Sequence, residues 1–197
     1  MEKQDTFRVV VLIPAYKPDD RLIQLTRELK EEKLDVLLVD DGGQKPFAPI
    51  FEQCRALGAE IAVHAVNQGK GRALKTGLNA ALNIWPDLSG VVTADADGQH
   101  TLRDILRIIE AMREHPNALV LGSREFTGDV PFKSRWGNRI TRFVYALASG
   151  VHVSDTQTGL RGLPACAIPA MITIDGERYE YEMNVLLKLR DMKLGVF

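Results

Sequence analysis

The stretch Val91-Val92-Thr93-Ala94-Asp95-Ala96-Asp97-Gly98-Gln99-His100 decides the fold class. An apolar, partly β-branched run ends in two aspartates that are spaced one residue apart. A short run of this kind is typical of a strand buried on both faces. Two carboxylates at the end of such a strand repel each other unless a cation lies between them. The stretch therefore predicts a buried strand that delivers two acids to a binding site.

Similar apolar runs occur along the rest of the chain, at 7–13, 36–39, 61–66 and 118–121. Segments of helix length separate them, and their apolar or small residues recur at helical spacing. The alternation of strands and helices predicts an α/β fold in which a mostly parallel sheet is flanked by helices, with right-handed crossovers. We expect one domain over residues 1–197, because no repeat or low-complexity tract divides the chain.

The predicted helices show which face each of them buries. The stripes are Leu22, Leu25 and Leu29; Ala73, Gly77, Ala80 and Ala81; and Ile105, Ile108, Ile109 and Met112. The second stripe consists of small residues, which predicts a helix that packs close to the sheet. Thr101, with Asp104 three positions later, predicts the N-terminus of the third helix.

Composition and charge limit the possible partners and location. The chain is 45% hydrophobic and 26% charged with a formal net charge of −1, which is ordinary for a globular protein and argues against a nucleic-acid partner. Its N-terminus has no signal peptide, and no apolar run approaches the roughly 20 residues that span a bilayer. Cys54 and Cys166 form no spacing motif, so we expect free thiols in an intracellular protein. The end at 193–197 reads like the start of a strand, so we expect a C-terminal extension beyond it.

Polar segments follow the predicted strands. They are Pro14–Pro18, Asp40–Gly43, Asn67–Arg72, Asp95–Asp97 and Gly122–Arg124. Because the carboxyl ends of parallel strands meet at one edge of a sheet, where ligands bind, we expect these segments to converge. A site that combines acids with Lys70 and Arg124 suits an anionic ligand held partly by a metal and partly by basic side chains.

Asp95, Asp97 and Gln99 are the candidate metal ligands, since Mg²⁺ and Mn²⁺ prefer oxygen ligands and usually keep substrate phosphates or waters. A turn with helix-capping acids is the alternative interpretation. An EF-hand is excluded because His100 and Leu106 stand where a glycine and a bidentate glutamate are required.

Two further loops admit both a structural and a ligand-binding interpretation. Asp40–Gly43 is typical of a turn, yet a carboxylate there can accept from a base N–H or a ribose hydroxyl. Asn67–Arg72 carries two glycines and two basic residues before a helix, whose N-terminus favours anions. It lacks Walker spacing, and no G-x-G-x-x-G follows the first strand, which argues against a dinucleotide-binding oxidoreductase.

The region 133–149 places Arg135, Arg139 and Arg142 on one helical face beside an aromatic and apolar face. This pattern fits an anionic lipid headgroup or a membrane surface, and equally a solvated arginine face over an ordinary core. In the following segment, 155–162, Arg161 can meet a phosphate and Asp155 can face a reacting centre.

The set of motifs together resembles the family 2 glycosyltransferases, and most closely the dolichyl- or polyprenyl-phosphate sugar synthases. The residues that carry the resemblance are Pro14-Ala15-Tyr16, Asp40-Asp41-Gly42, Asn67–Arg72, Asp95–His100, Gly122-Ser123-Arg124 and Asp155–Arg161. Two departures are Asp-Asp-Gly-Gly at 40–43, where Asp-Asp-Gly-Ser is commoner, and Gln-Thr-Gly-Leu-Arg at 157–161, where Ser-Gly-Phe-Arg is common.

The resemblance implies a GT-A fold, a nucleotide-sugar donor, a Mg²⁺ or Mn²⁺ cofactor and an inverting displacement at the anomeric carbon. The implied donor contacts are Pro14, Ala15, Tyr16, Asp40, Asp41, Gly69, Lys70, Asp95, Ala96 and Asp97. The implied metal ligands are Asp95, Asp97 and Gln99, and the implied acceptor-phosphate contacts are Arg124, Arg135, Arg139 and Arg161. The implied catalytic residues are Asp97, Asp155 and Arg124. The acceptor would be a polyprenyl or dolichyl phosphate, which places the enzyme in the cytoplasm at the inner face of the membrane.

Several alternatives stay open at this point. A sugar hydroxyl as acceptor would require a carboxylate base, with Asp155, Glu180 or Glu182 as candidates. A non-catalytic nucleotide-sugar-binding module is a further possibility. A sugar-phosphate nucleotidylyltransferase would need a glycine-rich, arginine-bearing loop after the first strand, and Pro14–Pro18 does not supply one.

Overall fold

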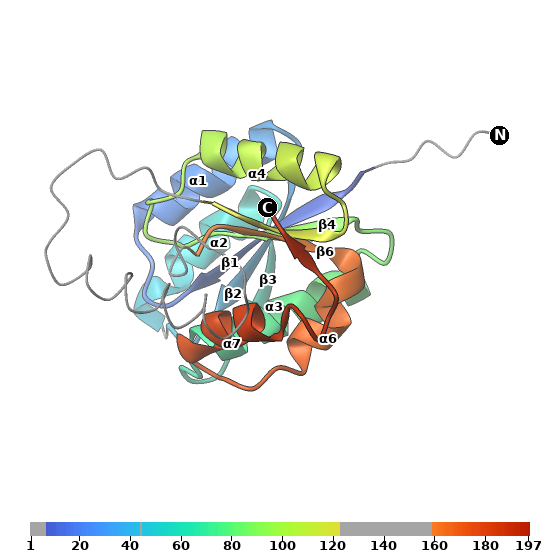
Figure 1. Cartoon of the computed structure of the whole chain (residues 1–197). Coiled ribbons are helices and arrows are strands. Elements are labelled where there is room, and N and C mark those ends of the chain that lie inside the picture. The colour runs from blue at the N-terminus through green and yellow to red at the C-terminus, as the bar shows by residue number, and fades with distance from the viewer. Residues whose placement is uncertain (1–6, 44, 123–158) are drawn as a thin grey trace, which may run out of the picture.

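A seven-stranded sheet forms the centre of the protein, with helices on both faces (Figure 1). The computed structural model describes residues 7–43, 45–122 and 159–197. The strands are β1 (Val9–Ala15), β2 (Asp35–Asp40), β3 (Glu60–Val63), β4 (Gly90–Thr93), β5 (Ala118–Leu121), β6 (Arg161–Pro164) and β7 (Gly195–Val196). The helices are α1 (Asp20–Glu31), α2 (Ala48–Ala56), α3 (Lys70–Ile84), α4 (Leu102–Glu114), α6 (Ile168–Ile172) and α7 (Glu180–Lys188), with short 3₁₀ turns η1 (Lys45–Phe47) and η2 (Ala165–Ala167).

The strand order is β3-β2-β1-β4-β6-β5-β7, which confirms the predicted mostly parallel α/β sheet. The strands β1 to β4 pair in parallel, and β6 runs antiparallel between β4 and β5. Because β6 is antiparallel to both of its neighbours, β5 points the same way as β4. The carboxyl ends of β1 to β5 therefore meet at one edge, as predicted.

The apolar stripes of the helices pack on opposite faces of the sheet. Helices α1, α2 and α4 cover one face, and α3, α6 and α7 cover the other. The predicted small-residue stripe lies in α3, where a Cβ at Gly77 would overlap the Leu12 side chain of β1. This close approach explains why the stripe contains small residues. The predicted N-terminus of α4 is confirmed by a capping box between Thr101 and Asp104.

Two expectations about strands were wrong. The expected strands include none at 155–162, whereas Arg161–Pro164 is β6 inside the sheet. The run 61–66 was expected to be buried on both faces, but β3 spans Glu60–Val63 at the edge of the sheet and its residues are exposed or half-buried. The helices on the two faces bury the side chains of a strand, and they cover this last strand of the sheet only in part.

None of the described helices combines the length and the apolar character that a membrane span requires.

Candidate functional site

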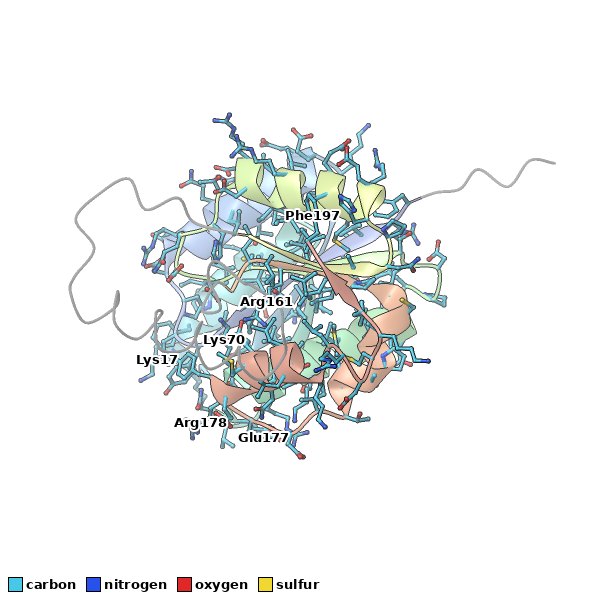
Figure 2. The ribbon with its side chains drawn as sticks, in the orientation of Figure 1. Lys17, Lys70, Arg161, Glu177, Arg178 and Phe197 are labelled. Carbon is cyan, nitrogen blue, oxygen red and sulfur yellow. The ribbon has the colours of Figure 1, made fainter. Side chains whose placement is uncertain are left out.

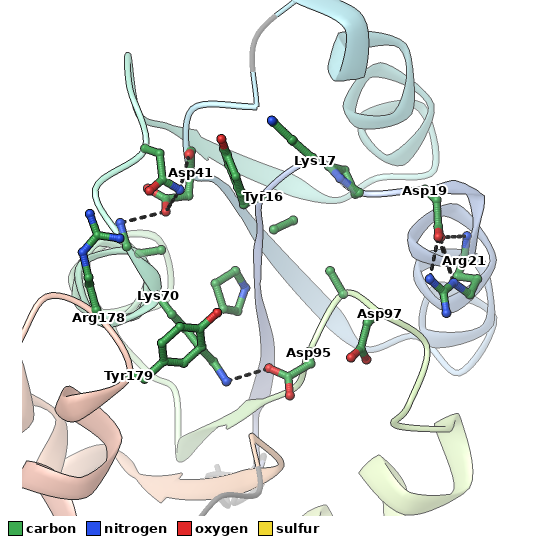
Figure 3. Close-up of a pocket in the computed structure, with 17 residues that line it drawn as sticks. Tyr16, Lys17, Asp19, Arg21, Asp41, Lys70, Asp95, Asp97, Arg178 and Tyr179 are labelled. Carbon is green, nitrogen blue, oxygen red and sulfur yellow. Dashed lines mark hydrogen bonds and ion pairs between the residues drawn. The ribbon is translucent and has the colours of Figure 1, made fainter.

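A cavity of about 510 Å³ opens at the edge where the parallel strands end (Figure 3). Its walls come from the segments after β1, β2 and β4, the start of α3, and the turn before α7. The lining residues are Pro14, Ala15, Tyr16, Lys17, Pro18, Asp19, Arg21, Asp41, Asn67, Gly69, Lys70, Ala73, Asp95, Ala96, Asp97, Arg178 and Tyr179. Every predicted donor contact except Asp40 therefore lies on one cavity.

The carboxylate of Asp95 is held by the protein on both of its oxygens. Lys70 Nζ lies 2.8 Å from Oδ1, and His100 Nε2 lies 3.3 Å from Oδ2. Gly159 approaches so closely that a Cβ there would overlap the same carboxylate. Burial raises the pKa of Asp95, but the bond to His100 and the charge of Lys70 outweigh it and hold the pKa far below the ordinary value. Asp95 is therefore a fixed anion at the base of the cavity.

Lys70 joins two acids that come from distant parts of the chain. Its Nζ lies 2.8 Å from Asp95 and 3.0 Å from Glu182 Oε2, and Glu182 belongs to α7. Burial lowers the pKa of Lys70, but the Glu182 and Asp95 carboxylates outweigh it and raise the pKa above the ordinary value. Lys70 therefore stays charged and ties α7 to the end of β4.

Arg161 lies at the start of β6, next to this network. It is 3% exposed, and its Nη1 donates to the backbone oxygen of Glu182 at 2.8 Å. Its Nε lies 4.0 Å from Glu182 Oε1. The structure thus brings Arg161 to Glu182, and its predicted role toward an acceptor phosphate stays a prediction.

Asp97 lies on the cavity wall with a partner from its own loop. Its Oδ1 accepts from the Gln99 backbone N–H at 3.0 Å, and its Oδ2 accepts from Gln99 Nε2 at 2.5 Å. Gly98 between them has a φ of 74°, a left-handed conformation that glycine adopts without strain. Asp97 and Gln99 thus form a compact turn beside Asp95.

The donor set suits a hard cation that also binds substrate phosphates. Within the described ranges, no three His, Cys, Asp or Glu side chains are clustered well enough to hold a metal by themselves. Asp95 and Asp97 nevertheless line the same cavity, and Mg²⁺ is commonly bound by one or two carboxylates together with substrate phosphates. The residues therefore fit a divalent cation that arrives with a phosphorylated ligand.

Asp41 organises the loop that precedes α3. It is 3% exposed, and its two oxygens accept from His64 Nδ1, Asn67 Nδ2, and the backbone N–H groups of Gln68 and Gly69, at 2.7 to 2.9 Å. The other nitrogen of His64 lies 2.9 Å from Thr76 Oγ1. The Asp41 carboxylate is thus occupied by donors of the protein, although the residue lines the cavity.

Asp40 does not line the cavity, and its Oδ1 accepts from the Gly43 N–H at 2.7 Å. The alternative interpretation of 40–43 as a turn therefore describes its local geometry. The contact between Asp40 and the donor stays a prediction.

The segment after β1 forms the exposed wall of the cavity. Tyr16 is 49% exposed, and the ammonium of Lys17 lies 5.1 Å from the centre of its ring. Lys17 has a φ of 52°, which is uncommon for a residue other than glycine. An exposed aromatic ring beside a cation is a suitable surface for a nucleoside and its phosphates.

Some predicted residues lie outside the described residues, namely Arg124, Arg135, Arg139 and Asp155. Glu180 is described, and its carboxylate accepts from the backbone N–H groups of Glu177 and Arg178. Of the two α7 candidates for a base, Glu182 is therefore the one that contacts Lys70.

Sequence reasoning missed Arg178, Tyr179, Asn67 and the role of His100. Arg178 and Tyr179 reach the cavity from a turn far along the chain, and no spacing pattern connects them with the β1 or β4 segments. Asn67 was part of a quoted motif, but its bond to Asp41 depends on tertiary contact.

Comparison with known proteins gives a consistent result. Residues 10–173 match the family described as Glycosyl transferase family 2. A UDP-N-acetylglucosamine–dolichyl-phosphate N-acetylglucosaminyltransferase of Methanococcus voltae is 28% identical to this chain, and the match covers 95% of this chain and 82% of the length of that protein. An undecaprenyl-phosphate mannosyltransferase of Micrococcus luteus is 26% identical to this chain, and the match covers 95% of this chain and 79% of the length of that protein.

Solved structures share the fold at low identity. A glucosyl-3-phosphoglycerate synthase from Mycobacterium tuberculosis, crystallised with Mn²⁺, UDP-glucose and phosphoglyceric acid, superposes with a TM-score of 0.69 at 19% identity. The match covers 96% of this chain and 67% of that chain, so this chain spans about two thirds of the solved protein. The likeness confirms the predicted GT-A architecture.

Proposed function

Because the chain belongs to glycosyl transferase family 2 and is a glycosyltransferase, we propose that it transfers a sugar from a nucleotide-sugar donor to a polyprenyl or dolichyl phosphate. One observation carries the proposal: Asp95, Asp97, Lys70 and the segment after β1 all line one cavity. The names of the Methanococcus voltae and Micrococcus luteus relatives support a lipid-phosphate acceptor.

The donor would lie along the carboxyl ends of β1 and β4. Pro14, Ala15 and Tyr16 form the wall on which we place the nucleoside, with the exposed Tyr16 ring against the base or ribose. Lys70 and the Asn67–Gly69 loop, which Asp41 orders, lie beside the diphosphate position. The loop needs this ordering because a flexible loop would lose conformational entropy each time a donor binds.

Asp97 and Asp95 would hold a divalent cation, with Gln99 next to Asp97. When bound, such a cation neutralises negative charge that develops on a departing diphosphate. Asp97 is the stronger candidate ligand, because among the described residues its oxygens accept only from Gln99 of the same turn, whereas those of Asp95 contact Lys70 and His100. Lys70 would add a positive charge to the same region, since its pKa is raised and it stays protonated.

The transfer itself requires little proton chemistry if the acceptor is a phosphate. An oxygen of the acceptor phosphate forms the new bond to the anomeric carbon, and the bond from that carbon to the diphosphate oxygen breaks with its electron pair. Attack from the face opposite the diphosphate inverts the configuration. The attacking oxygen is already anionic at neutral pH, so the protein mainly has to orient it. Arg124, Arg135 and Arg139 stay the predicted contacts for that phosphate.

A hydroxyl acceptor is the alternative, and Glu182 is the observation that favours it. This carboxylate is 12% exposed and lies 3.0 Å from Lys70 at the site. A hydroxyl must lose its proton as it attacks, so a carboxylate base would become essential. Glu182→Gln would then abolish turnover, whereas a lipid-phosphate acceptor would leave substantial turnover in the same variant.

The test is a panel of radiolabelled nucleotide sugars offered with undecaprenyl or dolichyl phosphate, with and without Mn²⁺. We expect one donor to transfer label into the organic phase in a Mn²⁺-dependent manner. Asp97→Asn should remove this transfer, and Asp191→Asn, in an exposed ion pair of the segment after α7, is the matched control. Absence of transfer from every donor to either lipid would refute the lipid-phosphate proposal.

A lipid acceptor also implies work at a membrane surface, which we propose is the inner face of the cytoplasmic membrane. Cosedimentation of the protein with vesicles that contain an anionic lipid would test this. Equal recovery with neutral and anionic vesicles would contradict an electrostatic attachment.

A further inference from the structure

Arg178 brings a positive charge to the wall of the cavity, and the described charge that it acts on is the Glu180 carboxylate of the same turn. Its side chain lines the cavity, and within the part of the chain that the structure describes it forms no hydrogen bond or ion pair. Figure 3 shows it on the same side as Lys70 and Asp41. An exposed arginine is normally solvated and needs no explanation, but one on the wall of a substrate cavity is available to a ligand.

The backbone around Arg178 is held firmly against the loop that precedes α3. The backbone N–H of Arg72 donates to the backbone oxygen of Glu177 at 2.9 Å. A Cβ at Gly69 would lie 2.8 Å from Arg178 Cγ, and one at Gly71 would lie 2.8 Å from the Arg178 oxygen. Glycine is therefore required at both positions for the two backbones to approach.

The side chain of Glu177 strengthens the same contact. Its Oε1 lies 2.7 Å from Arg72 Nη2 and 2.9 Å from Lys75 Nζ, and Lys75 is 7% exposed in α3. Figure 2 shows Glu177 and Arg178 next to each other at the same end of the molecule as Lys17. The turn is thus anchored through Glu177 while the next side chain, Arg178, points to the cavity.

The charges on the cavity wall show what is left for a ligand. Its lining includes four carboxylates, Asp19, Asp41, Asp95 and Asp97, and four basic side chains, Lys17, Arg21, Lys70 and Arg178. Arg21 is paired with Asp19 at 2.6 Å, and Lys70 is paired with Asp95 at 2.8 Å. Among these basic residues, Arg178 and Lys17 are the ones that form no ion pair with a described residue.

We propose that Arg178 binds a phosphate group of a substrate in this cavity and that Glu177 positions it. The proposal rests on the proposed function, because it takes the cavity as the substrate site. A guanidinium presents paired N–H donors that match phosphate oxygens, so it adds direction as well as charge. The phosphate can belong to the nucleoside diphosphate or to the lipid acceptor, and binding assays separate the two.

The first assay is calorimetric titration with UDP and with GDP in the presence of Mn²⁺. We expect Arg178→Ala to weaken the affinity for the diphosphate that the wild type binds by about tenfold, which corresponds to about 1.4 kcal/mol. The affinity for uridine or guanosine, which lack phosphates, should stay at the wild-type value. Arg178→Lys should recover part of the loss, and Arg190→Ala, which removes an exposed arginine from the turn after α7, is the matched control.

The second assay measures cosedimentation with phosphatidylcholine vesicles with and without undecaprenyl phosphate. If Arg178 serves the acceptor, Arg178→Ala lowers the binding that depends on undecaprenyl phosphate and leaves diphosphate affinity unchanged. Wild-type values for Arg178→Ala in both assays would overturn the proposal. A loss in either assay while no donor in the panel is turned over would refute the proposed function and leave the phosphate site standing.

The positioning role of Glu177 is tested by a double-mutant cycle. Glu177→Gln removes the charge that binds Arg72 and Lys75, and we expect it to weaken phosphate binding about threefold in the wild-type background, roughly 0.6 kcal/mol. In the Arg178→Ala background the same change should have no further effect on affinity. An equal loss in both backgrounds would show that Glu177 acts on the fold alone.

Discussion

Replacing Lys70 by methionine tests the ion network beneath the cavity most directly. The change keeps the length and the apolar stem of the side chain but removes the cation that Asp95 and Glu182 share. Removing one partner of a buried ion pair typically costs about 3–5 kcal/mol, because a charge is left uncompensated. The side chains here are 19%, 27% and 12% exposed, so water screens part of the loss. We therefore expect a loss of about 2 kcal/mol in the free energy of unfolding at pH 7.

Urea denaturation followed by circular dichroism measures this loss. With a slope of about 2 kcal/mol per M, the midpoint of Lys70→Met should fall by about 1 M. The matched control is Lys188→Met in α7, whose ion pair with Asp191 is exposed on both sides, so its midpoint should hardly move. Adding Glu182→Gln to Lys70→Met should restore part of the stability, because one of the two uncompensated carboxylates is removed.

The dependence of this loss on pH follows from the directions of the two pKa shifts. The pKa of Asp95 is lowered in the folded protein, so its stabilising contribution is present above the ordinary value of about 3.9 and is lost as the pH falls through the folded value. The pKa of Lys70 is raised, so its contribution is present below about 10.4 and is lost as the pH rises through the folded value. The difference between wild type and Lys70→Met should therefore be constant from about pH 5 to about pH 9. An equal midpoint shift in Lys188→Met, or a difference that grows on acidification, would refute the reasoning.

Three further predictions concern the cavity and the packing beneath it. Asp97→Asn should abolish the Mn²⁺-dependent part of UDP or GDP binding in calorimetry, while Asp191→Asn should bind as the wild type does; unchanged Mn²⁺ dependence would exclude Asp97 as a ligand. Gly77→Ala should lower the free energy of unfolding by about 1–3 kcal/mol, because the new Cβ overlaps Leu12, and a thermal unfolding midpoint equal to that of the wild type would contradict the observed packing of α3 on β1. Asp41→Asn should lower the free energy of unfolding by about 2 kcal/mol, because an amide cannot accept from all the donors that converge on this carboxylate. Hydrogen exchange of the Gln68 and Gly69 amides should become faster, and protection equal to that of the wild type would be evidence against the described bonds.

Features that depend on neighbouring residues in the chain could be predicted from the sequence. The apolar run before Asp95 forms β4, and the Thr101 and Asp104 pair forms the capping box of α4. The small residues around Gly77 lie against the sheet, because a helix with such a stripe can approach closely. In each case the local pattern and the tertiary structure require the same residues, so the local signal was sufficient.

The strand β6 shows what a local pattern cannot reveal. Arg161–Pro164 is four residues long and contains a glycine and a proline, both of which are poor strand formers. It is a strand because its backbone pairs with β4 on one side and with β5 on the other, where Arg161 is the partner of Thr93 and Leu121. A Cβ at Gly162 would overlap Met112 at 2.5 to 2.6 Å, so the glycine serves helix packing. These requirements come from segments far away in the chain.

The same limit applies to the acids of the candidate site, and it orders them for experiment. A carboxylate can bind a ligand only through oxygens that the protein leaves available, and the sequence does not tell which these are. Asp41 is saturated by donors from the α3 loop, and Asp95 is held by Lys70 and His100. Asp97 accepts only from Gln99 among the described residues, a partner on its own turn that can move with it or share a cation. A metal that binds in this cavity should therefore depend more on Asp97 than on the other acids, although all of them share one edge of the sheet.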